Sequence, residues 1–137
     1  MDFNEMNKAV IAEFHANAGK CSGYFEGQTM VLLHTTGARS GAERVNPLVY
    51  LPGDSERFYV IASKGGMPDN PDWYYNLKAN PEVTYEIGTE TGKGVASEIT
   101  GDERDRLYAE QVKRMPGFAE YEKSTTRKIP VIAIDPV

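Results

Sequence analysis

Two arginines and two glycines lie close together in a short polar segment, residues 36–44 (TGARSGAER). Gly37 and Gly41 give the backbone freedom to turn, so that successive N–H groups can point into one concavity. Arg39 and Arg44 add guanidinium groups, each of which can pair with two oxygens of a phosphate or carboxylate. The segment is therefore a candidate anion site, although a plain hairpin turn with solvated charges has the same composition.

A second polar segment, residues 63–76 (SKGGMPDNPDWYYN), directly follows an apolar run. Lys64 adds a positive charge there, and the two glycines after it would let a flat ligand approach the backbone. Asn70 and Pro71 predict the start of a helix, with Asn70 as the N-cap, and a helix N-terminus attracts anions. Trp73 offers a flat face beside that end, or it simply packs the helix onto a sheet.

A third segment, residues 115–127, brings aromatic and hydroxyl side chains together before the last apolar run. These side chains could form the wall of a pocket. They could equally belong to a helix that packs over the end of a sheet or barrel. The members are Met115, Phe118, Tyr121, Ser124, Thr125, Thr126 and Arg127.

The bulk composition suits one domain over residues 1–137 and excludes several classes of protein. With 15 basic and 20 acidic residues the net charge is −5, which argues against a nucleic-acid partner. Two histidines and one cysteine are too few and too scattered for a zinc site, so no metal is expected. The lone Cys21 allows no intrachain disulfide and fits a reducing cytoplasm. No apolar run approaches the roughly 20 residues of a membrane span.

The N-terminal region, residues 1–25, is expected to be an amphipathic helix and a linker. Apolar residues recur over residues 3–16 at spacings of three and four, and Gly19 and Gly23 follow them. The polar face is not rich in lysine or arginine, so strong binding to an anionic membrane is not indicated. Packing on the domain, cover over a pocket and weak membrane contact all stay open. The apolar positions are Phe3, Met6, Val10, Ile11 and Phe14.

Six short apolar runs predict strands, and most of them are neighbours joined by short turns. Pro47 cannot donate to a β-ladder, so its strand has an edge or a bulge there. Because helices do not alternate regularly with strands, a mostly antiparallel barrel with peripheral helices fits better than a doubly wound sheet. The expected strands are residues 29–35, 44–51, 57–62, 82–88, 93–99 and 129–134, and the expected helices are residues 71–79, about 100–115, and a short turn after Pro116.

The runs LLHTTGARSGAERVNPLVY, VIASKGGMPDNPDWYYNLKANPEV and TTRKIPVIAI together resemble the deazaflavin-dependent nitroreductase family. Its members are oxidoreductases that use the deazaflavin coenzyme F420. The resemblance covers nearly the whole chain from Met30 onward, and the ordered combination of the Gly/Arg turn with SKGGxxxNPxWYxNLKANP is specific. It implies a mainly β fold with peripheral helices, namely a split β-barrel of the flavin-reductase and pyridoxamine-phosphate-oxidase type.

The resemblance also implies that the two polar segments hold F420. Arg39, Ser40 and Arg44 would bind the phosphate and the start of the polyglutamate tail, and the later residues would flank the deazaflavin or its ribityl chain. The expected cofactor-binding residues are Ala38, Arg39, Ser40, Arg44, Val45, Asn46, Pro47, Leu48, Val49, Tyr50, Ile61, Ala62, Ser63, Lys64, Trp73, Tyr74, Tyr75 and Asn76.

The implied reaction is hydride transfer from reduced deazaflavin to a small-molecule acceptor, with the hydride chemistry supplied by the cofactor. Ser63 and Tyr121 are the candidate catalytic hydroxyls for proton delivery. The expected substrate pocket comprises Val49, Met115, Phe118 and Tyr121. Members that reduce nitroimidazoles carry tyrosines at all four of these positions, so we expect weak nitroimidazole reduction here and a preference for quinones.

Two alternatives stay open from the sequence. The chain could be an FMN-dependent reductase of the same barrel class, although the Gly/Arg turn and the SKGG segment match the deazaflavin branch. It could also bind the cofactor without catalysis, since three of the four tyrosines are absent. Barrel faces in this fold class often pair, so a homodimer is a further expectation.

Overall fold

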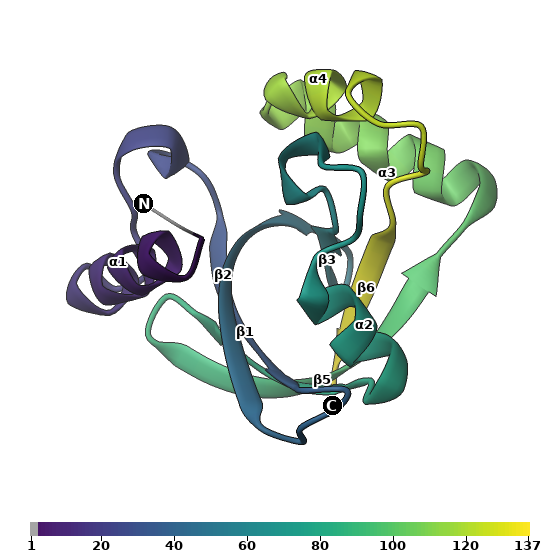
Figure 1. The fold of residues 1–137 in the computed structure, drawn as a ribbon. Coiled ribbons are helices and arrows are strands. Elements are labelled where there is room, and N and C mark those ends of the chain that lie inside the picture. Colours follow the sequence, from purple (N-terminus) through teal and green to yellow (C-terminus); the bar gives the residue numbers. More distant parts are fainter. Residues whose placement is uncertain (1–2) are drawn as a thin grey trace.

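In the computed structural model, which describes residues 3–137 and side chains from residue 5 onward, six antiparallel strands close into a barrel (Figure 1). The strand order is β1-β2-β3-β6-β5-β4, and β4 pairs back with β1. The mostly antiparallel barrel predicted from the sequence is therefore confirmed. The strands are β1 (Met30–Thr36), β2 (Glu43–Pro52), β3 (Phe58–Ile61), β4 (Glu82–Ile87), β5 (Glu90–Ile99) and β6 (Val131–Pro136).

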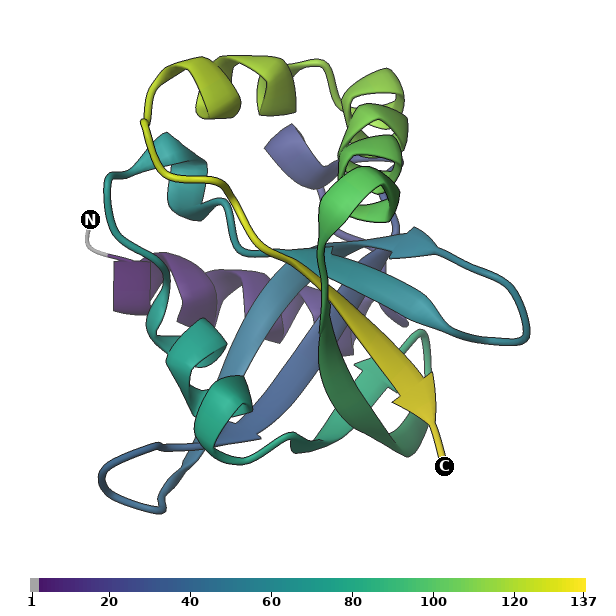
Figure 2. The same ribbon diagram turned by 90° about the vertical axis from the view of Figure 1, so that its right-hand side faces the viewer.

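Helices cover the barrel on several sides. The helix α1 (Phe3–Ala16) lies along one side, whereas α3 (Gly101–Arg114) and α4 (Gly117–Lys123) lie together over one end (Figures 1 and 2). The short α2 (Asp72–Ala79) packs on β1. Two single turns complete the chain, η1 (Gly23–Phe25) after α1 and η2 (Lys64–Gly66), which packs against α4.

The strand β1 shows why the barrel forms where it does. Its side chains point alternately to the two faces of the sheet, as in any β-strand. Val31 and Leu33 join the core that also contains Phe58, while Leu32 joins a second cluster with Phe14 of α1. All five side chains are buried. Because both faces of β1 are covered, its sequence is a continuous apolar run rather than an alternating one.

A third cluster lies between the barrel and the two C-terminal helices. Tyr59, Val131 and Ala133 contribute from the strands, and Leu107 and Phe118 contribute from α3 and α4. This cluster fixes α4, the predicted pocket wall, to the barrel end.

The edge predicted at Pro47 is present. Pro47 pairs with Leu32 of β1 in an uninterrupted register, and β3 pairs with β2 only from Tyr50 onward. β2 is therefore paired on one side only at Pro47, where a missing N–H costs no ladder hydrogen bond.

Two local expectations were wrong. The helix α2 begins at Asp72 rather than at Pro71, and Asn70 does not cap it. The Asn70 side chain instead accepts a hydrogen bond from Arg127, 2.8 Å away. On α1, Met6 was expected on the packed face but is 47% exposed, because only the C-terminal half of that face reaches the cluster around Phe14. The side chain of Phe3 lies outside the described residues.

None of the helices in residues 3–137 is long and apolar enough to cross a membrane. Within the same residues, no group of three or more metal-ligating side chains is placed to hold an ion.

A small polar network ties the end of α1 to the barrel. The Glu86 carboxylate lies 2.6 Å from Nε2 of His34 and 2.9 Å from Nε2 of His15. Burial raises the pKa of Glu86, but the hydrogen bonds with His34 and His15 outweigh it and leave the pKa below its ordinary value of 4.5. A carboxyl group whose pKa is lowered by folding stabilises the folded protein at pH values above its pKa in the unfolded chain. That stabilisation is lost as the pH falls through its pKa in the folded protein.

We therefore expect Glu86→Gln to lower the unfolding free energy by roughly 1–2 kcal/mol at pH 6, because the charge on the shared acceptor is removed. The deficit should shrink as the pH falls through the lowered pKa of Glu86, because the wild-type carboxylate is then protonated as well. Urea unfolding of both proteins at pH 6 and pH 3.5 measures this. A deficit of equal size at both values would contradict the assignment.

Candidate functional site

The Gly/Arg segment is the loop that joins β1 to β2. The Gly37 N–H donates to the Ala42 carbonyl at 2.8 Å, and the Gly41 N–H donates to the Gly37 carbonyl at 3.0 Å. Gly41 has φ of +71°, which favours glycine. The Ser40 hydroxyl oxygen accepts from the Ala42 N–H at 3.1 Å. The hairpin and the anion-site interpretations are therefore compatible, because one tight turn presents both arginines.

The buried side chain of Asn76 joins this turn to α2. Its Oδ1 accepts from the Ala38 N–H at 2.9 Å, and its Nδ2 donates to the Thr35 hydroxyl at 3.2 Å. Asn76 is only 7% exposed, so these bonds are shielded from water. Because the Asn76 side chain accepts one hydrogen bond and donates another, it fixes the distance between the two polar segments.

The two segments line one cavity of about 990 Å³. α1 forms a further wall, and cover over a pocket is one of the roles that the sequence left open for this helix. The cavity-lining residues that were predicted are Ala38, Arg39, Ser40, Arg44, Val45, Asn46, Trp73, Tyr75 and Asn76. The additional lining residues are Asn7, Lys8, Ile11, Gly37, Glu43 and Asp72.

Positive charge in this cavity is available for a ligand. Arg39 and Arg44 are exposed, and neither forms a hydrogen bond or ion pair with another described side chain. Glu43 is the nearest acid in sequence, but its carboxylate lies 3.2 Å from Nδ1 of His34. The two guanidinium groups are therefore free to pair with an anion, and the half-exposed ring of Tyr75 lies in the same cavity.

Arg127 organises the second segment, although the sequence analysis placed it only among the members of the third segment. Its guanidinium donates to the Ser63 carbonyl at 2.9 Å, to the Met67 carbonyl at 3.1 Å and to Asn70 Oδ1 at 2.8 Å. One planar guanidinium group thus holds a loop in which η2 is a single helical turn. Local sequence spacing could not indicate these contacts, because Arg127 is 60 residues away from Met67 in the sequence.

Lys64 and Ser63 have different surroundings at the start of this loop. Lys64 Nζ lies 2.9 Å from Asp69, and this hydrogen bond holds the pKa of Asp69 below its ordinary value. The lysine charge is thus already paired. The Ser63 side chain is half-buried, and its hydroxyl has no hydrogen-bond partner among the described residues.

The sequence suggested that Gly65 and Gly66 both leave the backbone open to a flat ligand. Gly66 does not. A Cβ at this position would lie 3.0 Å from the Cα of Tyr121 and 3.0 Å from the Cβ of Ser124. Gly66 therefore lets the loop approach the α4 backbone. Gly65 has nothing within 4 Å of the corresponding position.

The expected acceptor-side residues lie at the α4 end of the barrel, outside the cavity described above. Met115 is 6% and Phe118 is 8% exposed, and both pack in the cluster between barrel and helices, with Val49 and Tyr121 against it. The Tyr121 hydroxyl lies 2.7 Å from that of Tyr24 on η1. Burial, with the bond to Tyr24 as a second cause, raises the pKa of Tyr121 well above its ordinary value.

The remaining predicted cofactor residues do not line the cavity. The Tyr74 hydroxyl donates to Glu98 of β5 at 2.7 Å, and burial together with this bond raises the pKa of Tyr74 to about 12. Trp73 is buried in the barrel core with Leu77, so the packing interpretation holds for it even though it also borders the cavity. Pro47, Leu48, Tyr50, Ile61 and Ala62 are half-buried or buried strand and strand-end residues.

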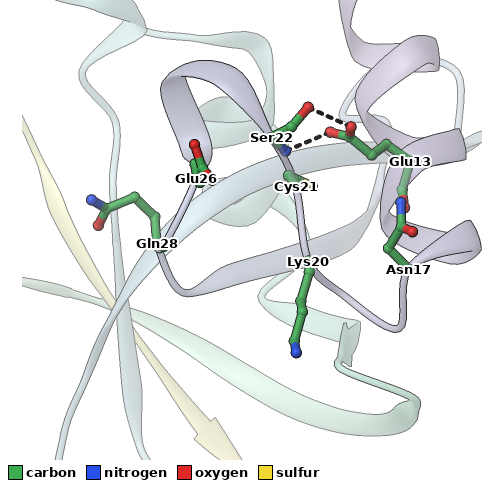
Figure 3. A pocket seen from close by; sticks show the side chains of 8 residues that line it. Glu13, Asn17, Lys20, Cys21, Ser22, Glu26 and Gln28 are labelled. Atoms are coloured by element: carbon green, nitrogen blue, oxygen red, sulfur yellow. Dashed lines mark hydrogen bonds between the residues drawn. The ribbon is translucent and has the colours of Figure 1, made fainter.

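A second cavity, of about 650 Å³, lies between the end of α1 and the segment after it (Figure 3). Glu13 crosses it and accepts from the Ser22 N–H at 2.8 Å and from the Ser22 hydroxyl at 2.6 Å. Its polar lining includes the exposed side chains of Asn17, Lys20 and Glu26 and the half-buried side chain of Gln28. It is separate from the predicted site residues.

Comparison with known proteins defines the class. The fold is shared with a pyridoxamine-5'-phosphate-oxidase-type protein of Listeria innocua, at a TM-score of 0.57 and 14% identity over 96% of this chain and 93% of that one. It is also shared with an FAD-binding protein of Mesorhizobium loti, at a TM-score of 0.53 and 17% identity over 81% and 83%. At such identities only the fold is shared, and it is the split barrel expected from the sequence.

More similar proteins define the family. The family model for F420H(2)-dependent quinone reductase matches residues 6–136. An F420H(2)-dependent quinone reductase of Mycobacterium tuberculosis is 35% identical over 107 residues, which are 76% of this chain and 71% of that protein. The structure of an F420-H2 dependent reductase is 39% identical, with a TM-score of 0.71, and the match covers 78% of this chain and 94% of that one. This chain belongs to the F420H(2)-dependent quinone reductase family, which confirms the resemblance stated above.

The Asn76 bridge generates a prediction. Asn76→Ala should lower the unfolding free energy by roughly 1–3 kcal/mol, because the Ala38 N–H and the Thr35 hydroxyl lose their buried partner. It should also speed hydrogen exchange of the Ala38 amide. Asn80→Ala is the matched control, since Asn80 makes only an exposed 3.5 Å contact with the Thr36 carbonyl. Unchanged Ala38 protection in Asn76→Ala would refute the role of the bridge.

Proposed function

We propose that this chain is an F420H2-dependent reductase that transfers a hydride from the reduced deazaflavin to a quinone. One observation carries the proposal. This chain of the family places two exposed arginines, which have no partner among the described side chains, in a large cavity beside α2. The names of the similar proteins, which specify F420H2 as reductant and quinone as acceptor, support the same conclusion.

The residues of the cavity fit the cofactor that the family implies. Its phosphate and glutamate tail are anionic, and Arg39 and Arg44 can pair with such oxygens through two N–H groups each. Ser40 lies between them on the same turn, and Ala38 directly precedes Arg39. Tyr75 offers a flat face, and Asn76 keeps the turn at a fixed distance from α2. Ser63, Lys64 and the strand residues 45–50 stay proposals for the ring and the ribityl chain.

Bound F420H2 supplies the hydride, and the protein supplies the binding, the orientation and the proton. Arg39 and Arg44 would bind and orient the anionic tail of the cofactor. Ser63 and Tyr121 are the proposed hydroxyls for proton delivery. A phenol with a raised pKa keeps its proton at neutral pH and can donate a hydrogen bond to developing negative charge on the acceptor.

The acceptor side favours a quinone over a nitroimidazole. Met115 and Phe118 are buried in the apolar cluster and offer no polar atom to a nitro group. Val49, also in contact with that cluster, adds none. Tyr121 alone can donate, which suits one carbonyl oxygen of a quinone. We propose weak or absent nitroimidazole reduction for this reason.

A homodimer is the proposed assembly. A structure described as a domain-swapped dimer is 35% identical to this chain at a TM-score of 0.72, over 91% of this chain and 94% of that one. This supports pairing of two copies without specifying which elements exchange. Weak contact of α1 with a membrane, and a cytoplasmic location, stay predictions from the sequence; the exposed Met6 supports the first.

The arginines are testable by cofactor binding alone. We expect Arg39→Ala and Arg44→Ala each to raise the dissociation constant for F420 about tenfold, because a charge-assisted hydrogen bond of roughly 1.5 kcal/mol is lost. Fluorescence titration at two salt concentrations measures this, and each variant should show a weaker salt dependence than the wild type. Arg106→Ala, which removes an exposed arginine of α3, is the matched control. FMN binding as tight as F420 binding would refute the cofactor assignment.

The acceptor preference is a separate prediction. With F420H2 as reductant, we expect kcat/KM for menadione to exceed that for a bicyclic nitroimidazole by on the order of 100-fold, because Tyr121 is the one proposed acceptor-side residue that can donate a hydrogen bond to a nitro group. Absorbance of the reoxidised cofactor follows both reactions. Comparable turnover of the two acceptors would contradict it. Tight F420 binding with no oxidation by any acceptor would instead indicate a cofactor-binding protein.

A further inference from the structure

Two tyrosines from distant parts of the chain meet through their hydroxyls. Tyr24 lies on η1, near the N-terminus, and Tyr121 lies on α4, and their oxygens are 2.7 Å apart. Either hydroxyl can be the donor. In both ribbon views η1 lies towards the α4 end of the barrel (Figures 1 and 2). The sequence motifs that carry the family resemblance begin near Met30, so they do not include Tyr24.

The segment that carries Tyr24 is firmly held. The two hydrogen bonds from Ser22 to Glu13 fasten it to α1 (Figure 3). Phe25 packs against the cluster around Phe14 and Leu32, and its ring lies 5.3 Å from that of Tyr24. Tyr24 itself is 59% exposed, so its ring contributes little burial. The segment therefore positions the Tyr24 hydroxyl while it leaves the Tyr24 ring largely exposed.

Tyr121, by contrast, faces inward. Its ring lies 5.0 Å from Phe118 in the cluster that also holds Met115. Its backbone contacts Gly66, three residues after Ser63, so Tyr121 borders the loop to which the proposed function assigns the ring of the cofactor. The pair therefore runs from an exposed hydroxyl to a half-buried one beside the proposed reaction site.

We propose that Tyr24 relays protons from water to Tyr121 during quinone reduction, acting as a positioning residue for the Tyr121 hydroxyl. The inference rests on the proposed function. The hydride brings two electrons and one hydrogen to the quinone. Tyr121 gives its hydroxyl proton to a quinone oxygen, Tyr24 gives its own to Tyr121, and Tyr24 regains one from water. One quinone, one hydride and one proton thus give one hydroquinone.

The relay answers a difficulty that Tyr121 alone would face. Burial disfavours the tyrosinate, so a lone Tyr121 would have to carry a full negative charge in an apolar setting after donating its proton. A second hydroxyl at 2.7 Å supplies a proton as the first one leaves. The negative charge is then passed to an exposed position, where water solvates it.

Three measurements test the relay, with Tyr24→Phe as the main variant. We expect kcat with menadione to fall roughly tenfold, with the dissociation constant for F420 unchanged. Tyr24→Phe in a Tyr121→Phe background should cause no further loss, because the relay is already broken. The solvent isotope effect on kcat should fit two exchanging protons in the wild type and one in Tyr24→Phe. Tyr85→Phe, a tyrosine of β4 outside the site, is the control and should match the wild type.

A readout without cofactor completes the test. In 13C-tyrosine NMR of the free protein, the titration of Tyr121 should move back towards the ordinary value of 10 in Tyr24→Phe, because one cause of the raised pKa is lost. Equal losses from Tyr24→Phe in both backgrounds, or an unchanged isotope effect, would overturn the relay while the proposed function stands. A wild-type protein that binds F420H2 but reduces no quinone would overturn both.

Discussion

The side-chain amide of Asn76 is the interaction on which the proposed cofactor site depends. The turn at residues 36–44 and the helix α2 come from separate parts of the chain. Asn76 joins them by bonding to the Ala38 N–H and the Thr35 hydroxyl inside the protein, where such bonds are costly to break. Arg39 and Arg44 are presented to the cavity because the turn between them is fixed in this way.

A second constraint acts at the opposite end of the loop that starts at Ser63. Arg127 holds the loop carbonyls, and Gly66 allows the loop to touch the α4 backbone. The helix that carries Tyr121 and the loop that carries Ser63 are thereby one packed unit. A substitution in either α4 or the Ser63 loop is expected to shift both, since closely packed interiors transmit small displacements.

The sequence predicted the barrel well because its strands obey local rules. The apolar run of β1, the one-sided pairing at Pro47 and the short turns between neighbours all follow from residue type and spacing. Local rules failed where a distant partner decided the outcome. Asn70 has the features of an N-cap, but its side chain accepts a hydrogen bond from Arg127 instead. The candidate site was predicted through the combination of two motifs, since each alone was compatible with an ordinary turn or a packing helix.

The N-terminal region was the least predictable part and has the most specific consequence. Periodicity alone made residues 1–25 an amphipathic helix and a linker. In the fold, α1 forms a wall of the cavity through Asn7, Lys8 and Ile11, while the linker brings Tyr24 to Tyr121. The same segment thus borders the proposed cofactor site on one side and the proposed acceptor site on the other. Because the hydrogen bonds between Glu13 and Ser22 fasten its two parts together, the position of Tyr24 in the proposed relay depends on the packing of α1 as well as on that of η1.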